Sequence, residues 1–179
     1  MAVFRMLAVV VAIWTLSADA ALAAPQEVHP LTRSECAAVR EMLEEAVPIG
    51  PGWRMSESAF PPGVPWVSGR FCRLLAVGTG EHVESEKIRS AEDIAGYIAG
   101  ALRRADWSEE HFARKFRAEE NGQRAFALEK GRAVCRVTLV SKPVSAVSAR
   151  PVREARKNGA GSLSPYERSY WIGVDCFKR

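Results

Sequence analysis

The 179-residue sequence predicts an α+β fold, with two helices packed on one mainly antiparallel sheet of five or six strands. Two patterns carry this prediction. Apolar residues recur at helical spacing in two segments, and strand-like alternation between turn signals fills most of the C-terminal half. The four cysteines, an even number, add the expectation of two disulfides. The chain that follows an N-terminal export signal suits a single domain, 24–179.

The first 23 residues have the three-part pattern of a cleavable signal peptide. Arg5 supplies the positive charge, Met6 to Leu16 form an apolar run, and Ala21-Leu22-Ala23 is an A-x-A cleavage site. A membrane span needs roughly 20 apolar residues, so the short run favours a cleaved signal over an anchor. The short run and the alanine-rich cleavage region are typical of bacterial signals. We therefore expect a periplasmic or secreted bacterial protein.

The first predicted helix begins at a capping box, in which Thr32 is followed three residues later by Glu35. The preceding Pro25 to Leu31 segment is interpreted as a short tail. Pro48 and the Gly50-Pro51-Gly52 run are expected to end the helix. Four residues form its predicted apolar face: Cys36, Val39, Leu43 and Val47.

Two strands and a second helix are expected next. Trp53 to Phe60 is a candidate strand, and Gly69 to Val77 is apolar on both faces, which is typical of a central strand. The second helix begins at Ser90. Gly96 and Gly100 within it either admit another backbone or are tolerated at about 1 kcal/mol each, and we favour the second interpretation. Its predicted apolar positions are Ile94, Tyr97, Ile98, Ala101, Leu102 and Ala105.

The C-terminal part is expected to form antiparallel sheet. Phe112 to Glu119 and Gln123 to Glu129 flank Asn121-Gly122, a strong hairpin signal. A turn at Lys130-Gly131 leads into a strand over Ala133 to Val140. The last strand, over Glu167 to Phe177, has two predicted faces. The core face carries Tyr170, Ile172, Val174 and Cys176, and the opposite face carries Trp171 and Phe177.

The aromatic face of the last strand has two interpretations. Either a second layer of structure covers Trp171 and Phe177, or they form a binding surface. We favour the covering layer.

The four cysteines are predicted to pair as two disulfides, in one of three connectivities. We favour pairs between neighbours in sequence, and the last two cysteines both lie on core-facing sets. No C-x-x-C and no Cys-His cluster is present, so we expect neither a metal site nor a cofactor. The favoured pairs are Cys36 with Cys72 and Cys135 with Cys176.

Residues 142–165 are predicted to form a flexible basic loop. Without Arg5 and Asp19 of the signal, the chain has 24 basic and 20 acidic residues and a net charge of +4. Residues 142–165 alone have a net charge of +4, so the rest of this chain is neutral. Such a loop either is simply solvated or attracts an anionic partner, such as lipid headgroups, outer-membrane sugars or an acidic protein. Nucleic acid is excluded because the charge is only local. The candidate contacts are Arg150, Arg153, Arg156 and Lys157.

The sequence carries no catalytic signature. It contains no G-x-S-x-G nucleophile elbow, and no two histidines have metal-ligand spacing. We therefore expect a non-catalytic envelope binding or accessory protein. The alternative is a small periplasmic hydrolase with a site near His82, His111 and neighbouring carboxylates. That alternative requires a cleft in which a histidine lies within about 3 Å of a carboxylate.

Overall fold

The computed structural model describes residues 25–50, 52–59, 67–120, 123–143 and 167–179. The predicted signal peptide, the Asn121-Gly122 turn and the four basic candidate contacts lie outside the described residues.

The described strands form one sheet in the order β2-β3-β1-β7-β6-β5-β4, in which β3 and β7 also pair directly. All pairings are antiparallel except that of β1 with β3. The predicted central strand is confirmed, since β3 lies between β2 and β7. The strands are β1 (Gln26–Pro30), β2 (Arg54–Ala59), β3 (Val67–Thr79), β4 (Ala118–Glu120), β5 (Gln123–Lys130), β6 (Ala133–Pro143) and β7 (Arg168–Lys178).

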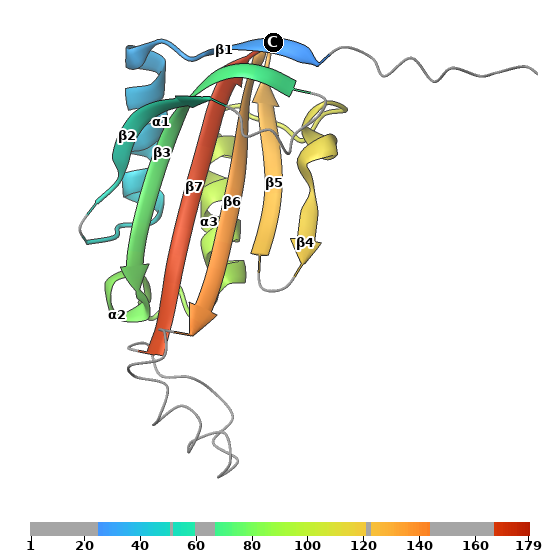
Figure 1. The fold of residues 1–179 in the computed structure, drawn as a ribbon. Helices are drawn as coiled ribbons and strands as arrows, with labels where there is room; N and C mark the ends of the chain where they lie inside the picture. The colour runs from blue at the N-terminus through green and yellow to red at the C-terminus, as the bar shows by residue number, and fades with distance from the viewer. Residues whose placement is uncertain (1–24, 51, 60–66, 121–122, 144–166) are drawn as a thin grey trace, which may run out of the picture.

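Two helices, α1 (Arg33–Ala46) and α3 (Ala91–Arg104), pack on one face of the sheet, behind it in Figure 1. A short helix, α2 (Gly80–Val83), follows β3, and a 3₁₀ turn, η1 (Ala113–Phe116), precedes β4. The apolar faces of both long helices and the inner positions of β3, β6 and β7 form one core. The predicted α+β fold class is thereby confirmed. None of the described helices is long and apolar enough to cross a membrane.

The predicted capping box of α1 is confirmed, and it also ties the helix to the sheet. The Glu35 carboxylate accepts hydrogen bonds from the Thr32 backbone N–H at 2.9 Å and from its hydroxyl at 2.7 Å. The other carboxylate oxygen lies 2.7 Å from Lys178 Nζ on β7. Lys178 first, and then Thr32, lower the pKa of Glu35 to about 2.

A Glu35→Gln variant is expected to lose stability at neutral pH but not in strong acid. The folded-state pKa is depressed, so the contribution is present above the unfolded-state value of about 4.3 and is lost as the pH falls through about 2. Denaturant unfolding at several pH values measures this difference. Glu45→Gln, an exposed carboxylate on the same helix, is the control. A deficit of Glu35→Gln that persists unchanged at pH 2 would contradict the assignment.

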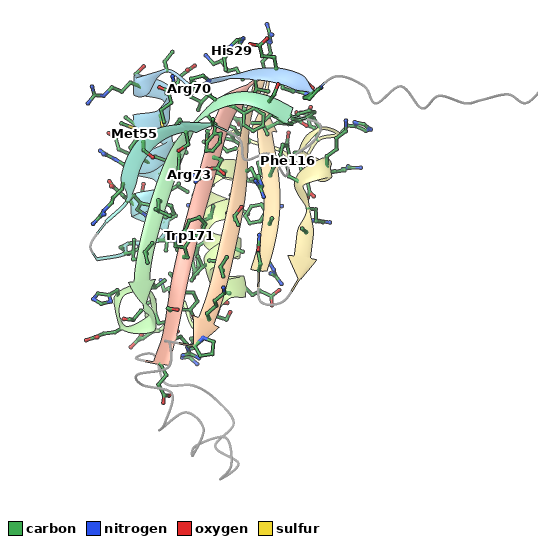
Figure 2. The ribbon with its side chains drawn as sticks, in the orientation of Figure 1. His29, Met55, Arg70, Arg73, Phe116 and Trp171 are labelled. Carbon is green, nitrogen blue, oxygen red and sulfur yellow. A yellow bond between two sulfur atoms is a disulfide. The ribbon has the colours of Figure 1, made fainter. Side chains whose placement is uncertain are left out.

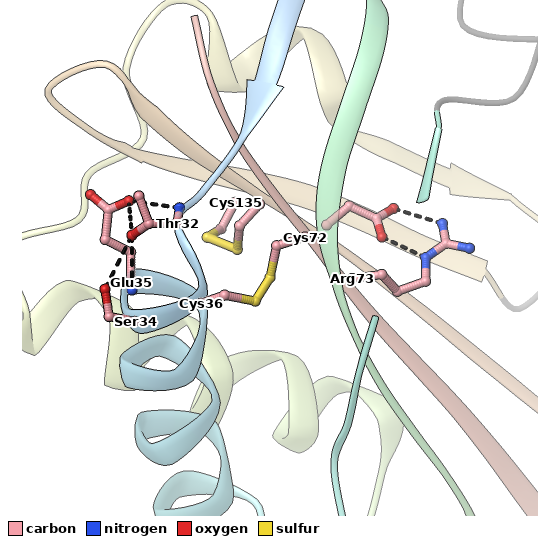
Figure 3. Close-up of a disulfide and its surroundings, with 9 residues drawn as sticks. Thr32, Ser34, Glu35, Cys36, Cys72, Arg73 and Cys135 are labelled. Carbon is pink, nitrogen blue, oxygen red and sulfur yellow. Dashed lines mark hydrogen bonds and ion pairs between the residues drawn. A yellow bond between two sulfur atoms is a disulfide. The ribbon is translucent and has the colours of Figure 1, made fainter. Parts of the chain in front are cut away.

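Both predicted disulfides are confirmed. Cys36 on α1 bonds to Cys72 on β3 and so fixes the helix to the sheet (Figure 3). Cys135 and Cys176 lie directly opposite each other on β6 and β7, with Cα atoms 4.1 Å apart. All four side chains are buried in the same core.

The second predicted helix is confirmed as α3, with one difference in its apolar face. Ser90 caps it by accepting from the Asp93 backbone N–H at 3.1 Å. Tyr97 is 38% exposed, because it lies at the margin of the face that Ile94 and Ile98 bury. A Cβ on Gly96 would meet no atom within 4 Å, so no other backbone approaches there. The interpretation of a tolerated glycine therefore holds for Gly96.

The interpretation of Pro25 to Leu31 as a tail is wrong, because Gln26–Pro30 forms β1. β1 pairs in parallel with the start of β3 and antiparallel with the end of β7. Only Val28 of this strand is fully buried, so no alternating pattern marks it in the sequence. Gly69, at φ +119°, makes the pairing possible, since a Cβ there would collide with the Val28 carbonyl oxygen.

The predicted strand over Phe112 to Glu119 is wrong in its first half, which forms η1. The helical turn brings the Phe112 and Phe116 rings to 5.6 Å from each other. An extended chain rises about 3.3 Å per residue and would separate them by about 13 Å. Both rings pack against Phe177, so the turn buries more apolar surface than a strand would. Of the predicted strand, only the part that forms β4 pairs with β5 in the predicted hairpin.

Candidate functional site

Among the residues that the structure describes, the helices cover one face of the sheet, and the other face is covered at one end only. There, Phe116 of η1 and Phe112, which directly precedes η1, pack with Phe71 and Phe177 in a second, smaller apolar cluster. Figure 2 views this side, with Arg73 and Trp171 on it beyond the part that η1 covers. The predicted covering layer therefore exists, but it leaves the Trp171 part of the face uncovered.

The uncovered part, which we call the open face, consists of three cross-strand rows from β3, β7 and β6. Antiparallel pairing places one residue of each strand side by side in each row. From the far end toward η1, the rows are Val77–Trp171–Val140, Leu75–Gly173–Thr138 and Arg73–Asp175–Arg136.

The apolar row exposes large side chains. Trp171 is 37% exposed and Val77 is 46% exposed, although both are apolar. The ideal Cβ position of Gly173 lies 3.3 Å from the Trp171 ring, so the indole leans over the glycine in the next row. The missing side chain at Gly173 thus lets the indole lie along the sheet. This arrangement gives the open face a flat aromatic platform beside the charged row.

In the charged row, Asp175 is buried and both its carboxylate oxygens are engaged by one arginine. Arg73 Nε donates to Oδ1 at 2.8 Å and Arg73 Nη2 donates to Oδ2 at 3.1 Å (Figure 3). This bidentate bond raises the pKa of Arg73. The pair therefore neutralises itself.

Arg136, on the other side of Asp175, lacks such a partner. Its Nε is buried without a hydrogen-bond partner, and its guanidinium carbon lies 5.9 Å from the centre of the Phe116 ring. Burial lowers the pKa of Arg136, although the charge of Asp175 opposes this effect. Asp175 is shared between two arginines, so the row keeps one net positive charge, and Arg136 is only partly buried, so an anion on the open face can approach its guanidinium. The row can thus accept one negative charge.

The structure does not bring the histidines of the hydrolase alternative to a carboxylate. His82 Nδ1 lies 2.7 Å from the Thr79 hydroxyl, within the turn that begins α2. None of the ion pairs in the described ranges includes His82 or His111. Across those same ranges, no three or more His, Cys, Asp or Glu side chains come together as metal ligands would.

Another cluster of ionisable groups lies at the α2 end of the sheet, where it joins two segments of the chain. The Tyr170 hydroxyl donates to Glu84 Oε1 at 2.7 Å, and Arg168 Nη2 lies 2.6 Å from Glu84 Oε2. Burial, together with the bond to Glu84, raises the pKa of Tyr170 to about 12. The hydroxyl therefore stays protonated and joins β7 to the segment after α2.

Comparisons with known proteins give no relative: no family model, no curated protein and no solved structure matches the chain. The functional argument therefore rests on the geometry of the open face.

Proposed function

We propose that this chain is an exported, non-catalytic binding protein of the bacterial envelope, and that its open face receives an acidic segment of a partner protein. One observation carries the proposal. Arg136, whose buried Nε has no hydrogen-bond partner, lies on the same face as the exposed Trp171 and Val77.

The apolar part of the open face supports a protein partner. Tryptophan and arginine are enriched at the centres of protein interfaces, where they contribute most of the binding free energy. The Trp171 ring already packs against the sheet at Gly173, and side chains that are packed before binding lose less entropy on binding. Such a platform binds the apolar side chains of a partner protein more favourably than it binds a partner surface that is fully hydrated.

The charges support an acidic segment. Arg136 adds a positive charge that Asp175 does not neutralise, because Asp175 is engaged by Arg73. Lys142 and Pro143, the first two residues of the predicted basic loop 142–165, belong to β6 instead, and Lys142 pairs with Ser169 two residues beyond the Val140–Trp171 pair. Arg150, Arg153, Arg156 and Lys157 are proposed to attract the partner over a longer range.

The export signal and the two disulfides support an envelope or extracellular location. Disulfides persist in oxidising compartments such as the periplasm. A cleavable signal over residues 1–23 would deliver the chain there.

A binding assay on the purified protein tests the proposal. Proteins retained from an envelope extract at low salt are compared between wild type and Trp171→Ala. We expect the acidic partner to bind the variant at least about tenfold more weakly, which corresponds to about 1.4 kcal/mol. Tyr97→Ala is the matched control, because Tyr97 is equally exposed, at 38% against 37%, but lies on α3.

Two results would overturn the use of the open face. One is equal retention of the partner by Trp171→Ala and wild type. The other is binding that disappears only when Arg150, Arg153, Arg156 and Lys157 are neutralised, which would assign recognition to the basic segment alone. Vesicles rich in phosphatidylglycerol form a separate arm. If the protein binds these vesicles as tightly as it binds the protein partner, the ligand is a lipid surface and the proposed protein partner is wrong.

A further inference from the structure

A cleft lies on the helix side of the sheet, between α3 and the edge that β4 and β5 form. The cleft has a volume of about 450 Å³, within the range of about 300–1,000 Å³ found for small-molecule pockets. Ala99 of α3 and Phe126 and Leu128 of β5 supply apolar lining. The cleft is distinct from the open face, because α3 covers the opposite side of the sheet (Figure 1).

Charged side chains line the cleft, and the three arginines outnumber the two glutamates, which leaves one net positive charge: Arg103, Arg117, Arg124, Glu92 and Glu109. Arg117 Nη2 lies 3.0 Å from Glu109, and Arg124 Nη1 lies 3.4 Å from Glu92. Both pairs have exposed members, and such surface pairs are weak. Arg103 forms no ion pair within the part of the chain that the structure describes. An anionic ligand group would therefore meet a free guanidinium at Arg103.

Gly96 keeps the cleft open. It lines the cleft, and a Cβ at this position would meet no atom within 4 Å. Glycine inside a helix is less stable than alanine by about 1 kcal/mol, so its presence here has a cost in stability. Any larger side chain at this position would extend into the space of the cleft. Gly100, one turn later, does not line the cleft, and a Cβ there would lie 3.6 Å from Arg104 Nη1.

We propose that this cleft binds a small amphipathic organic acid. The carboxylate lies against Arg103, with Arg117 within the same rim, and the apolar body lies on Phe126 and Ala118, the apolar lining residues with accessible side chains. Guanidinium groups bind carboxylates through paired, charge-assisted hydrogen bonds, which fixes the orientation of the ligand. The proposal goes beyond the binding of a partner protein at the open face and does not depend on it.

Octanoate is the probe, and two-dimensional NMR of the ¹⁵N-labelled protein is the measurement. We expect saturable shifts of the amides of residues 95–103 and 124–128. Gly96→Leu adds a side chain at the lining of the cleft and is expected to weaken octanoate binding at least about tenfold, whereas Gly100→Leu leaves it unchanged. Arg103→Gln is expected to weaken it about fivefold or more, and Arg104→Gln, one residue outside the lining, to leave it unchanged.

The melting temperatures of the four variants show whether each remains folded. Octanol, which has the same chain without the charge, is expected to bind more weakly than octanoate to the wild type. The proposal is overturned if octanoate causes no saturable shifts at millimolar concentration. It is also overturned if Gly96→Leu, still folded, binds octanoate as well as Gly100→Leu does.

Discussion

The double variant Cys135→Ala/Cys176→Ala is expected to unfold with a free energy about 2–5 kcal/mol below that of the oxidised wild type. The bridge joins residues 41 apart in sequence, and loop-closure entropy assigns about 4 kcal/mol to a loop of that length. Both side chains have no exposed surface, so their truncation also removes packing in the core between β6 and β7. Denaturant unfolding of the oxidised proteins measures the difference.

Cys36→Ala/Cys72→Ala is the comparison for this experiment, because that bridge joins α1 to β3 instead of two neighbouring strands. Wild type under reducing conditions separates the effect of the bond from that of the lost sulfur atoms. An unfolding midpoint of the Cys135→Ala/Cys176→Ala variant equal to that of oxidised wild type would contradict the stabilising role of the bridge.

Gly69→Ala is expected to destabilise the protein by about 3 kcal/mol. The backbone at Gly69 has φ +119°, which side-chain-bearing residues rarely adopt, and a Cβ there would collide with the carbonyl oxygen of Val28. The substitution therefore strains β3 and displaces β1. Hydrogen exchange of residues 26–30 is expected to accelerate together with the loss of stability.

Gly131→Ala separates the backbone conformation from the collision. Gly131 also has a positive φ, +59°, but no atom lies within 4 Å of its Cβ position. Its replacement is expected to cost only about 1 kcal/mol. Equal costs at the two positions would show that β1 does not lie against Gly69.

The sequence predicts those elements whose signals are local. The capping box at Thr32 and Glu35 and the cap at Ser90 locate the starts of both long helices. Pairing cysteines that are neighbours in sequence gives both correct disulfides, and for Cys135 and Cys176 the core-facing positions on two strands support the pair. The sequence does not predict β1, because its pairing partners lie far away in the sequence and only Val28 of the strand is buried. η1 escapes because the packing of Phe116 on Phe177 decides its conformation.

The candidate site follows the same division. Alternation along the last strand predicts that Trp171 lies on the face opposite Cys176, and the structure has it there. The row that places Arg73 and Arg136 on either side of Asp175 needs the register of three strands, which no local pattern specifies. The unpartnered Arg136 Nε depends on that register and on the packing of η1, so only the structure shows it.

Site-specific photo-crosslinking tests the role of the open face most directly. A photoreactive phenylalanine derivative replaces Val77, which is 46% exposed on the open face, or Tyr97, which is 38% exposed on α3. Each protein is irradiated with the acidic partner that the wild type retains at low salt. We expect the partner to crosslink at position 77 and not at position 97. Crosslinking at position 97 without crosslinking at position 77 would contradict recognition through the open face.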